Sequence, residues 1–157
     1  LVKDTYNPIA TTCTMSPTTI PINVSNGRFS LDINSVQTLG TISIPDPGCP
    51  YKLDYVYAGY ADQAPHNDGG KPYHINIRIA LDSPTNYIGA YADTWHGDSA
   101  TDSPIYGWSD QGVAADAISL TGAHTLYVVA ESDILPIFGT ADNVYASAVG
   151  RIIMYRQ

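Results

Sequence analysis

Glutamate and lysine are scarce in this sequence, which holds a single Glu, Glu131, and three Lys among 157 residues. Fourteen of the fifteen acidic side chains are Asp. Because Glu and Lys favour helices whereas Asp favours caps and turns, this balance argues against a mainly helical domain. No stretch shows a sustained 3.6-residue hydrophobic period, and no repeat recurs.

Basic residues are also few. Seven Lys and Arg stand against fifteen Asp and Glu, which gives a formal charge of -8. Nucleic-acid binding is excluded on this ground, because affinity for phosphates comes mainly from Lys and Arg. The chain also lacks an apolar run of the roughly 18 to 20 residues that a membrane-spanning helix needs, so no membrane insertion is expected.

Cysteine occurs only at Cys13 and Cys49. The two are too far apart for a redox CxxC motif and too few for a zinc site of their own. Two outcomes stay open, a Cys13–Cys49 disulfide and a pair of buried free thiols, since nothing in the sequence fixes the redox compartment.

Metal and catalytic motifs are missing too. The four histidines form no HxH or HExxH pair, and the spacing of Asp93, Asp98 and Asp102 does not match a calcium-binding loop. The GxSxG nucleophile motif is absent, and in a chain with this many Asp, pairs of carboxylates carry no information about glycosidase activity. We expect no cofactor, no metal and no enzymatic activity.

The sequence is rich instead in the residues of short strands and tight turns, including twelve Tyr, thirteen Gly and eleven Pro. Alternating apolar residues predict strands at 20–24, 29–33, 39–44, 51–61, 75–81, 87–92, 124–131 and 144–155, with a further short one near 105–108. On 51–61 the pattern sets Tyr51, Leu53, Tyr55 and Tyr57 on one face. A Pro-Asp-Pro-Gly turn at 45–48 reverses the chain.

The first two of these strands are expected to form a hairpin. Asn26-Gly27 separates the two alternating runs, and such a pair tolerates the positive φ angles of a type I′ turn. Pro21 removes a backbone donor, which places its strand at a sheet edge.

The fold class predicted from this pattern is all-β, an antiparallel, jelly-roll-like β-sandwich of eight to nine strands. We interpret residues 1–12 as an N-terminal arm and residues 13–157 as one sandwich domain, which is an ordinary domain size.

The loop at 93–110, within a long polar stretch at 93–117, is the candidate ligand site. It concentrates Asp residues and both Trp of the chain, and saccharides bind by stacking on aromatic rings while carboxylates and amides take their hydroxyls. The alternative is a surface loop whose Asp residues cap turns and whose Trp residues anchor it to the core. The candidate ligand-binding residues are Asp93, Trp95, His96, Asp98, Tyr106, Trp108 and Asp110.

Three segments resemble the C-terminal domains of minor tail and receptor-binding proteins of bacteriophages, especially those of actinobacteria. They are TISIPDPGCPY at 41–51, SLTGAHTLYVVAES at 119–132 and VYASAVGRIIMYR at 144–156. The resemblance implies a jelly-roll-like, commonly trimeric domain on a virion surface that contacts a host-cell glycan or a neighbouring virion protein. The Cys13 and Cys49 pair departs from the family pattern, and the first forty residues do not resemble it.

The functional hypothesis is therefore a non-enzymatic binding module on the virion surface. Two alternatives stay open, a structural or decoration protein of a capsid or tail and a secreted, lectin-like module. The small residues Ala146, Ser147, Ala148 and Gly150 likewise have two interpretations, packing about a trimer axis or close packing inside one sandwich.

Overall fold

The computed structural model describes residues 13, 15–32, 35–63, 73–96, 108–134 and 140–157. These residues form eight strands and no helix, so the described part of the chain contains no helix that could cross a membrane. The strands are β1 (Thr18–Asp32), β2 (Val36–Ile44), β3 (Tyr51–Gln63), β4 (Tyr73–Leu81), β5 (Tyr87–His96), β6 (Trp108–Leu120), β7 (His124–Ile134) and β8 (Thr140–Arg156). The expected N-terminal arm, residues 1–12, lies outside the described residues.

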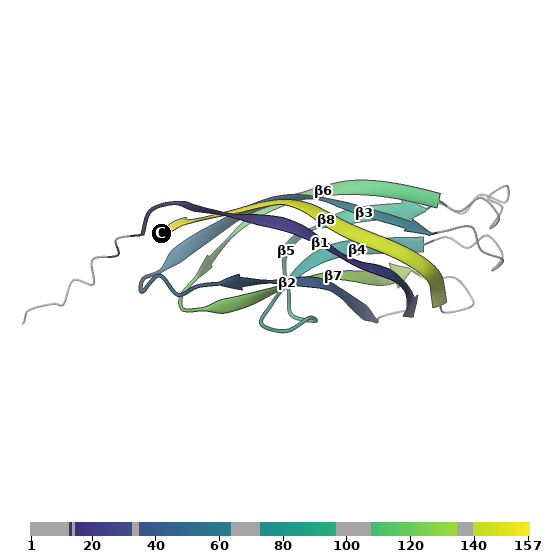
Figure 1. Cartoon of the computed structure of the whole chain (residues 1–157), viewed down its shortest axis with the longest axis horizontal. Helices are drawn as coiled ribbons and strands as arrows, with labels where there is room; N and C mark the ends of the chain where they lie inside the picture. Colours follow the sequence, from purple (N-terminus) through teal and green to yellow (C-terminus); the bar gives the residue numbers. More distant parts are fainter. Residues whose placement is uncertain (1–12, 14, 33–34, 64–72, 97–107, 135–139) are drawn as a thin grey trace, which may run out of the picture.

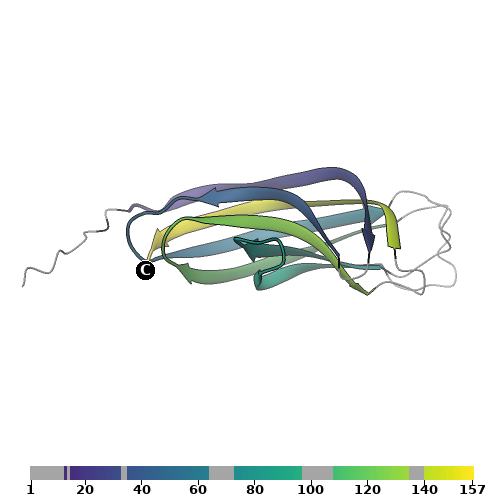
Figure 2. The same cartoon turned by 90° about the horizontal axis from the view of Figure 1, so that it is seen from below.

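The strands form two four-stranded sheets that pack face to face (Figures 1 and 2). Sheet A has the order β1-β8-β3-β6 and sheet B the order β2-β7-β4-β5, with every pair antiparallel. In this order β1 pairs with β8, β2 with β7, β3 with β6 and β4 with β5. That is one long antiparallel ribbon rolled upon itself, the jelly-roll topology that the strand pattern predicted.

The core lies between the two sheets and is built by the period-two alternation of the strands. On β3 the predicted face is confirmed, because Tyr51, Leu53, Tyr55 and Tyr57 are all buried. Ile residues of β4 and Leu126 and Val128 of β7 face them from sheet B. Buried tyrosines need partners for their hydroxyls. Accordingly, the Tyr57 hydroxyl donates to the Ile77 carbonyl oxygen at 2.7 Å.

The predicted hairpin at Asn26-Gly27 is wrong. Residues 18–32 form one continuous strand, β1, which pairs along its length with β8. Gly27 does adopt a positive φ of 49°, but between Ser25 and Arg28 the register against β8 shifts by one residue. Asn26-Gly27 therefore forms a β-bulge rather than a reversal. The edge position inferred from Pro21 is confirmed, since β1 is an outer strand of sheet A.

The polar stretch at 93–117 is also more regular than expected. β5 extends to His96, and β6 occupies residues 108–120. The inward positions of β6 include Gly112 and Ala114, and its outward positions include Ala115 and Ala117. Because small residues stand on both faces, the sequence does not show the apolar–polar alternation of a typical strand. Of the short strand expected near 105–108, only Trp108 lies within the described residues.

The small residues of the closing strand pack inside one sandwich. Ala146 and Ala148 have no exposed surface and face the core. At Gly150 a Cβ would lie 2.1 Å from the Val56 carbonyl oxygen of the neighbouring strand, closer than side chains can approach.

Cys13 and Cys49 form a disulfide with a Cα–Cα distance of 5.6 Å. It ties the segment before β1 to the turn that leads into β3. The nearby Arg156 guanidinium donates to the Cys13 carbonyl oxygen at 3.5 Å, so the start of β1 and the end of β8 are held at the same end of the sandwich (Figure 1).

The topology sorts the connections between strands into two groups. Those that follow β2 and β6 lie at the end that also holds the disulfide and the C-terminus, and the turn after β4 points the same way but lies nearer the middle of the molecule (Figure 1). The strand ends that flank the other four connections, including His96 of β5 and Trp108 of β6, lie at the opposite end. We call this the distal end.

Candidate functional site

The structure places the candidate residues of the sequence around the distal ends of β5 and β6. Asp93, Trp95 and His96 are among the last residues of β5, and Trp108 and Asp110 are among the first residues of β6. For Trp95, His96 and Trp108 the structure describes the backbone but not the side chain. Asp98, Tyr106 and the intervening Asp102 lie outside the described residues.

β5 and β6 belong to different sheets and approach each other closely along the side of the sandwich. A Cβ at Gly112 would lie 2.3 Å from the Asp93 carbonyl oxygen, so only glycine permits this contact. The Asp110 carboxylate accepts the backbone N–H of Gln111 at 2.8 Å. The structure therefore brings Asp93 and the Asp110–Gly112 segment together, although they are far apart in the sequence.

The Asp93 side chain lies on the outer face of sheet B and pairs with His74 of β4. The His74 Nε2 atom contacts the Asp93 Oδ1 atom directly. The imidazole is largely covered, with 12% of its side chain exposed, while the carboxylate is 57% exposed. One face of the Asp93 carboxylate is thus open to solvent while the other is held in place.

Three further polar side chains continue this arrangement from β4 across to β7. The Arg78 Nε atom donates to the Glu131 carboxylate at 2.7 Å, and both side chains are mostly buried. The Asn76 amide donates to the same carboxylate oxygen at 3.4 Å. The buried Oδ1 of Asn76 accepts no hydrogen bond from the described residues.

Two tyrosines of β5 cover the Arg78 guanidinium. Its central carbon lies 4.1 Å from the ring centre of Tyr91 and 4.8 Å from that of Tyr87, which is cation–π geometry. Burial, followed by the nearby Glu131 carboxylate, raises the pKa of the Tyr87 hydroxyl. Tyr91 keeps 40% of its surface exposed, so one aromatic face at this site remains accessible.

These side chains form a continuous polar strip on the outer face of sheet B, next to the distal end. Exposed aromatic surface, fixed carboxylates, an amide and a guanidinium are the groups with which proteins bind saccharides and polar peptide segments. The polar strip consists of His74, Asn76, Arg78, Tyr87, Tyr91, Asp93 and Glu131.

Of these residues, sequence reasoning identified only Asp93 as a site candidate. The alternation of Ile with His74, Asn76 and Arg78 did indicate that β4 has a polar outer face. It could not indicate that Glu131 and Tyr91 lie beside that face, because their strands are distant in the chain.

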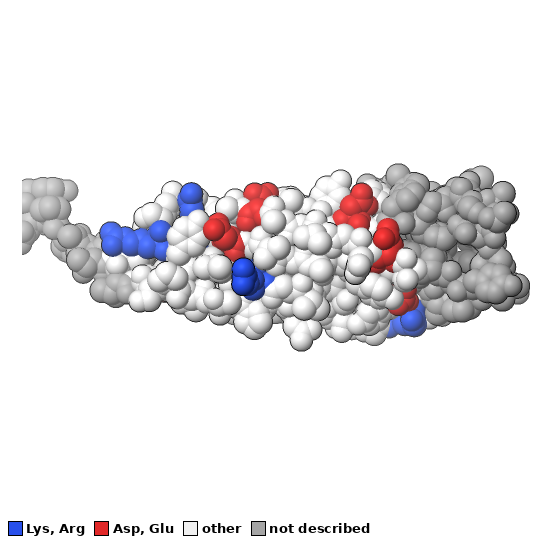
Figure 3. Space-filling model, turned by 90° about the horizontal axis from the view of Figure 1, so that it is seen from above, with Lys and Arg blue, Asp and Glu red and all other residues white. Residues whose placement is uncertain are grey.

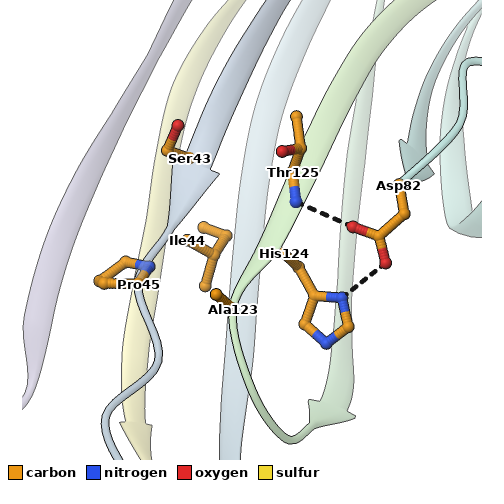
Figure 4. A pocket seen from close by; sticks show the side chains of 7 residues that line it. All are labelled: Ser43, Ile44, Pro45, Asp82, Ala123, His124 and Thr125. Atoms are coloured by element: carbon orange, nitrogen blue, oxygen red, sulfur yellow. Dashed lines mark hydrogen bonds and ion pairs between the residues drawn. The ribbon is translucent and has the colours of Figure 1, made fainter.

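A second group of polar side chains lines a shallow hollow at the end opposite the distal end (Figure 4). The His124 Nδ1 atom contacts the Asp82 Oδ2 atom at 2.7 Å, and the His124 Nε2 atom contacts the Thr121 carbonyl oxygen at 2.8 Å. The other Asp82 oxygen accepts the backbone N–H of Thr125 at 2.9 Å. This cluster joins the turn after β4 to the turn after β6.

Both ring nitrogens of His124 face acceptors, so the protonated imidazole, which donates from both nitrogens, is the form that this geometry favours. The hydrogen bond to Asp82 raises the pKa of His124, and the Thr121 carbonyl oxygen adds to this effect. The pKa of Asp82 is lowered, chiefly by the Thr125 N–H and then by His124. We call Asp82, His124, Thr121 and Thr125 the His124 clasp.

Ser43 lines the same hollow and gives it the residue types of a hydrolase triad (Figure 4). A catalytic histidine must accept the serine proton on Nε2. In the clasp this atom donates to the Thr121 carbonyl oxygen instead. The arrangement therefore acts as a structural tie rather than as an activated nucleophile.

Within the described ranges no three His, Cys, Asp or Glu side chains gather as a metal site would require. Pairs such as His74–Asp93 and Asp82–His124 are two-membered and already satisfy each other.

No protein-family model matches the sequence, and no curated protein is detectably similar to it. Solved structures of similar shape come from infectious bursal disease virus. The Gx strain structure has 13% identity and a TM-score of 0.45, the T13 viral particle has 13% and 0.45, and the VP2 subviral particle has 12% and 0.45. The likeness covers 90% of this chain in each case but only 32%, 31% and 33% of the viral chains. This chain thus spans about a third of their length, and we draw no functional conclusion from a likeness at this level.

Proposed function

We propose that this domain is a non-enzymatic binding module on a virion surface that contacts a host-cell saccharide, with a protein of the same virion as the alternative partner. The observation that carries the proposal is the polar strip beside the distal end. It presents the open faces of Tyr91 and Asp93 close to the ends of β5 and β6 that carry Trp95 and Trp108.

The geometry favours a binding role for this surface for two reasons. His74 and Arg78 hold the carboxylates of Asp93 and Glu131 in fixed positions, so a ligand meets a preorganised set of groups. The strip also lies on strands rather than on a loop, which keeps its geometry rigid. The placement on a virion rests on the three segments that resemble phage tail proteins.

The proposal is tested by screening the full chain on a glycan array and on host cells. We expect a saccharide to bind, and we expect Tyr91→Ala and Asp93→Asn to weaken it at least tenfold, as the loss of a stacking face or a charged hydrogen bond does. Trp95→Ala and Trp108→Ala test the sequence-derived half of the site in the same assay. Tyr60→Ala, an aromatic truncation on the outer face of sheet A, is the matched control and is expected to bind like the wild type.

Two results would count against saccharide binding. One is the absence of any bound glycan or cell surface. The other is a ligand that binds all four variants as tightly as the wild type. A pull-down against the proteins of the parent virion then tests the alternative that the partner is a virion protein. In that case a virion protein should bind, and the same substitutions should weaken its binding.

A structural role in assembly is the second candidate, and a specific observation favours it. Exposed valines gather on the outer face of sheet A, on the side of the sandwich away from the polar strip. A group of exposed apolar side chains on one face is typical of a surface that contacts another protein.

A further inference from the structure

Four large apolar side chains are exposed among the described residues, and three of them lie on one face. Val113, Val149 and Val56 are exposed by 72%, 57% and 37% on the outer face of sheet A. The strand register sets Val113 of β6, Ala58 of β3 and Val149 of β8 side by side in one row. Val56 lies in the next row, beside the exposed Ala115. The centre of this face is therefore a contiguous apolar patch.

The row of Val113, Ala58 and Val149 carries no charge, whereas Arg151 of β8 lies beside Val56 in the next row. Viewed onto sheet A, charged side chains lie on both sides of a band that holds none (Figure 3). We define the outer face of sheet A as the outward residues between the rows of Lys52 and Asp62. Its charged members are Arg28, Lys52 and Arg151 together with Asp54 and Asp62.

This charge balance is unusual for a chain with a formal charge of -8. The outer face of sheet A holds three cations and two carboxylates, and Asp62 is already paired with Arg28 at 2.6 Å. The excess of acidic residues thus lies elsewhere on the molecule. Two copies of the chain can approach each other through this face without the repulsion that their net charge would otherwise cause.

The size of the face matches what association needs. Four strands and eleven residue rows cover roughly 700 Å² at ordinary strand spacing and rise. A standard protein interface buries about 800 Å² on each partner. A flat sheet face of this kind packs on another at about 10 Å, with the strands of the two sheets nearly aligned.

We propose that the outer face of sheet A packs against the same face of a second copy of this chain, related by a two-fold axis. If the axis crosses the strands between the rows of Val56 and Ala58, Val113, Ala58 and Val149 of one copy lie on Ala115, Val56 and the aliphatic part of Arg151 of the other. The same operation sets Lys52 of one copy opposite Asp62 of the other, so that the ends of the face are complementary in charge. A face that complements itself is what a two-fold interface requires.

The test is the mass of the full chain in solution, measured by sedimentation equilibrium over a range of protein concentrations. The monomer has a mass of 16.9 kDa, and we expect the wild type to form a dimer. Val113→Lys and Val149→Lys each place a cation in the apolar patch and should weaken dimerisation at least tenfold, because the ammonium group is desolvated against Ala115 or repelled by Arg151 of the opposite copy. Thr41→Lys makes the same change at an exposed strand position of sheet B and should leave the dimer intact.

Circular dichroism and thermal unfolding establish that each variant is folded, as expected for exposed positions. A wild type that stays monomeric at up to about 1 mM protein would overturn the proposal. So would a trimer, a dimer that both valine variants leave unchanged, or one that Thr41→Lys disrupts equally. Failure of saccharide binding has no bearing on this outcome, since the polar strip lies on the other sheet.

Discussion

His124 shows how a single side chain can fasten two distant turns of this domain. Its imidazolium donates to Asp82 and to the Thr121 carbonyl oxygen at once, so it links the turn after β4 with the turn after β6. The residue is partly exposed, with 18% of its side chain accessible. The imidazole can therefore exchange protons with the solvent, while its contacts with Asp82 and Thr121 hold the two turns together.

We expect the contribution of the His124 clasp to stability to depend on pH. The raised pKa of His124 gives stability that is complete below its ordinary value of 6.5 and is lost as the pH rises through the raised pKa. The lowered pKa of Asp82 gives stability that is complete above its ordinary value of 3.8 and is lost as the pH falls through the lowered pKa. Both contributions are present together between these ordinary values.

Urea unfolding of His124→Gln and the wild type checks this expectation. The free energies of unfolding should differ more at about pH 5.5 than at about pH 9, because the stability that the protonated imidazole contributes is lost as the pH rises through its raised pKa. Thr85→Ala, an exposed change in the turn after β4, is the control, and its difference from the wild type should not vary with pH. A His124→Gln effect of equal size at both values would contradict the clasp as an ionic contact.

At the residue scale, the sequence allows candidate site residues to be identified, but not the residues that they contact. Asp93 was identifiable because an exposed carboxylate near Trp residues is typical of ligand sites. Its contact with His74 depends on the pairing of β5 with β4, and that of Arg78 with Glu131 depends on the pairing of β4 with β7. Neither pairing can be derived from the residues themselves.

At the scale of single strands, the closing strand β8 depends on a glycine. β8 lies between β1 and β3 in sheet A, and at Gly150 the backbone of β3 leaves no room for a side chain. The inward positions that precede it carry the small residues Ala146 and Ala148, so this part of the core is filled by large side chains from elsewhere, such as Tyr57.

Gly150→Ala should destabilise the domain by about 1 to 3 kcal/mol, because its Cβ would overlap the backbone of Val56 and force the strands apart. The free energy of unfolding in urea measures the effect. Arg151→Ala, one residue along and exposed, should change it by less than about 0.5 kcal/mol. Equal stability of Gly150→Ala and the wild type would show that the strands can separate without cost.

The strands that sequence patterning predicted well are those with strong alternation. β3, β4, β7 and β8 each hold large apolar residues at alternating positions, such as Ile75, Ile77 and Ile79 in β4, and the structure has these strands where they were expected. β6 was missed because its inward positions 112 and 114 carry Gly and Ala. The Asn26-Gly27 bulge was mistaken for a turn because both need the same positive φ, and only the partner strand β8 distinguishes them.

At the scale of the whole molecule, the disulfide closes the end opposite the distal end. Cys13 and Cys49 are separated by 36 residues, which include all of β1 and β2. A cross-link over such a loop restricts the unfolded chain, and the loop entropy it removes predicts a stabilisation of about 2 to 4 kcal/mol.

Cys13→Ser with Cys49→Ser should lower the free energy of unfolding by that amount while leaving the strand content unchanged by circular dichroism. Reduction of the wild type with dithiothreitol should lower it equally, and it should have no effect on the double variant. If the reduced and oxidised wild type unfold at the same urea concentration, the disulfide contributes no stability. Mass spectrometry without reductant establishes the oxidised state of the starting material.

The jelly-roll topology itself could be predicted only as a class. Eight alternating strands without helices favour a sandwich, yet many strand orders satisfy the same pattern. The rolled ribbon pairs β1 with β8 and β2 with β7, and these contacts span nearly the whole chain. Local residue patterns do not encode such distant partners.

The separation of the two ends of the sandwich has a practical consequence for protein engineering. The disulfide, the His124 clasp and the C-terminus are all at one end, while the strand termini His96 and Trp108 open at the other. A library that varies or lengthens the segment between those two residues would leave the end with the disulfide and the His124 clasp unchanged. The domain is therefore suited as a display scaffold, in which new binding surfaces are selected at the distal end while the C-terminus at the opposite end is fused to a carrier.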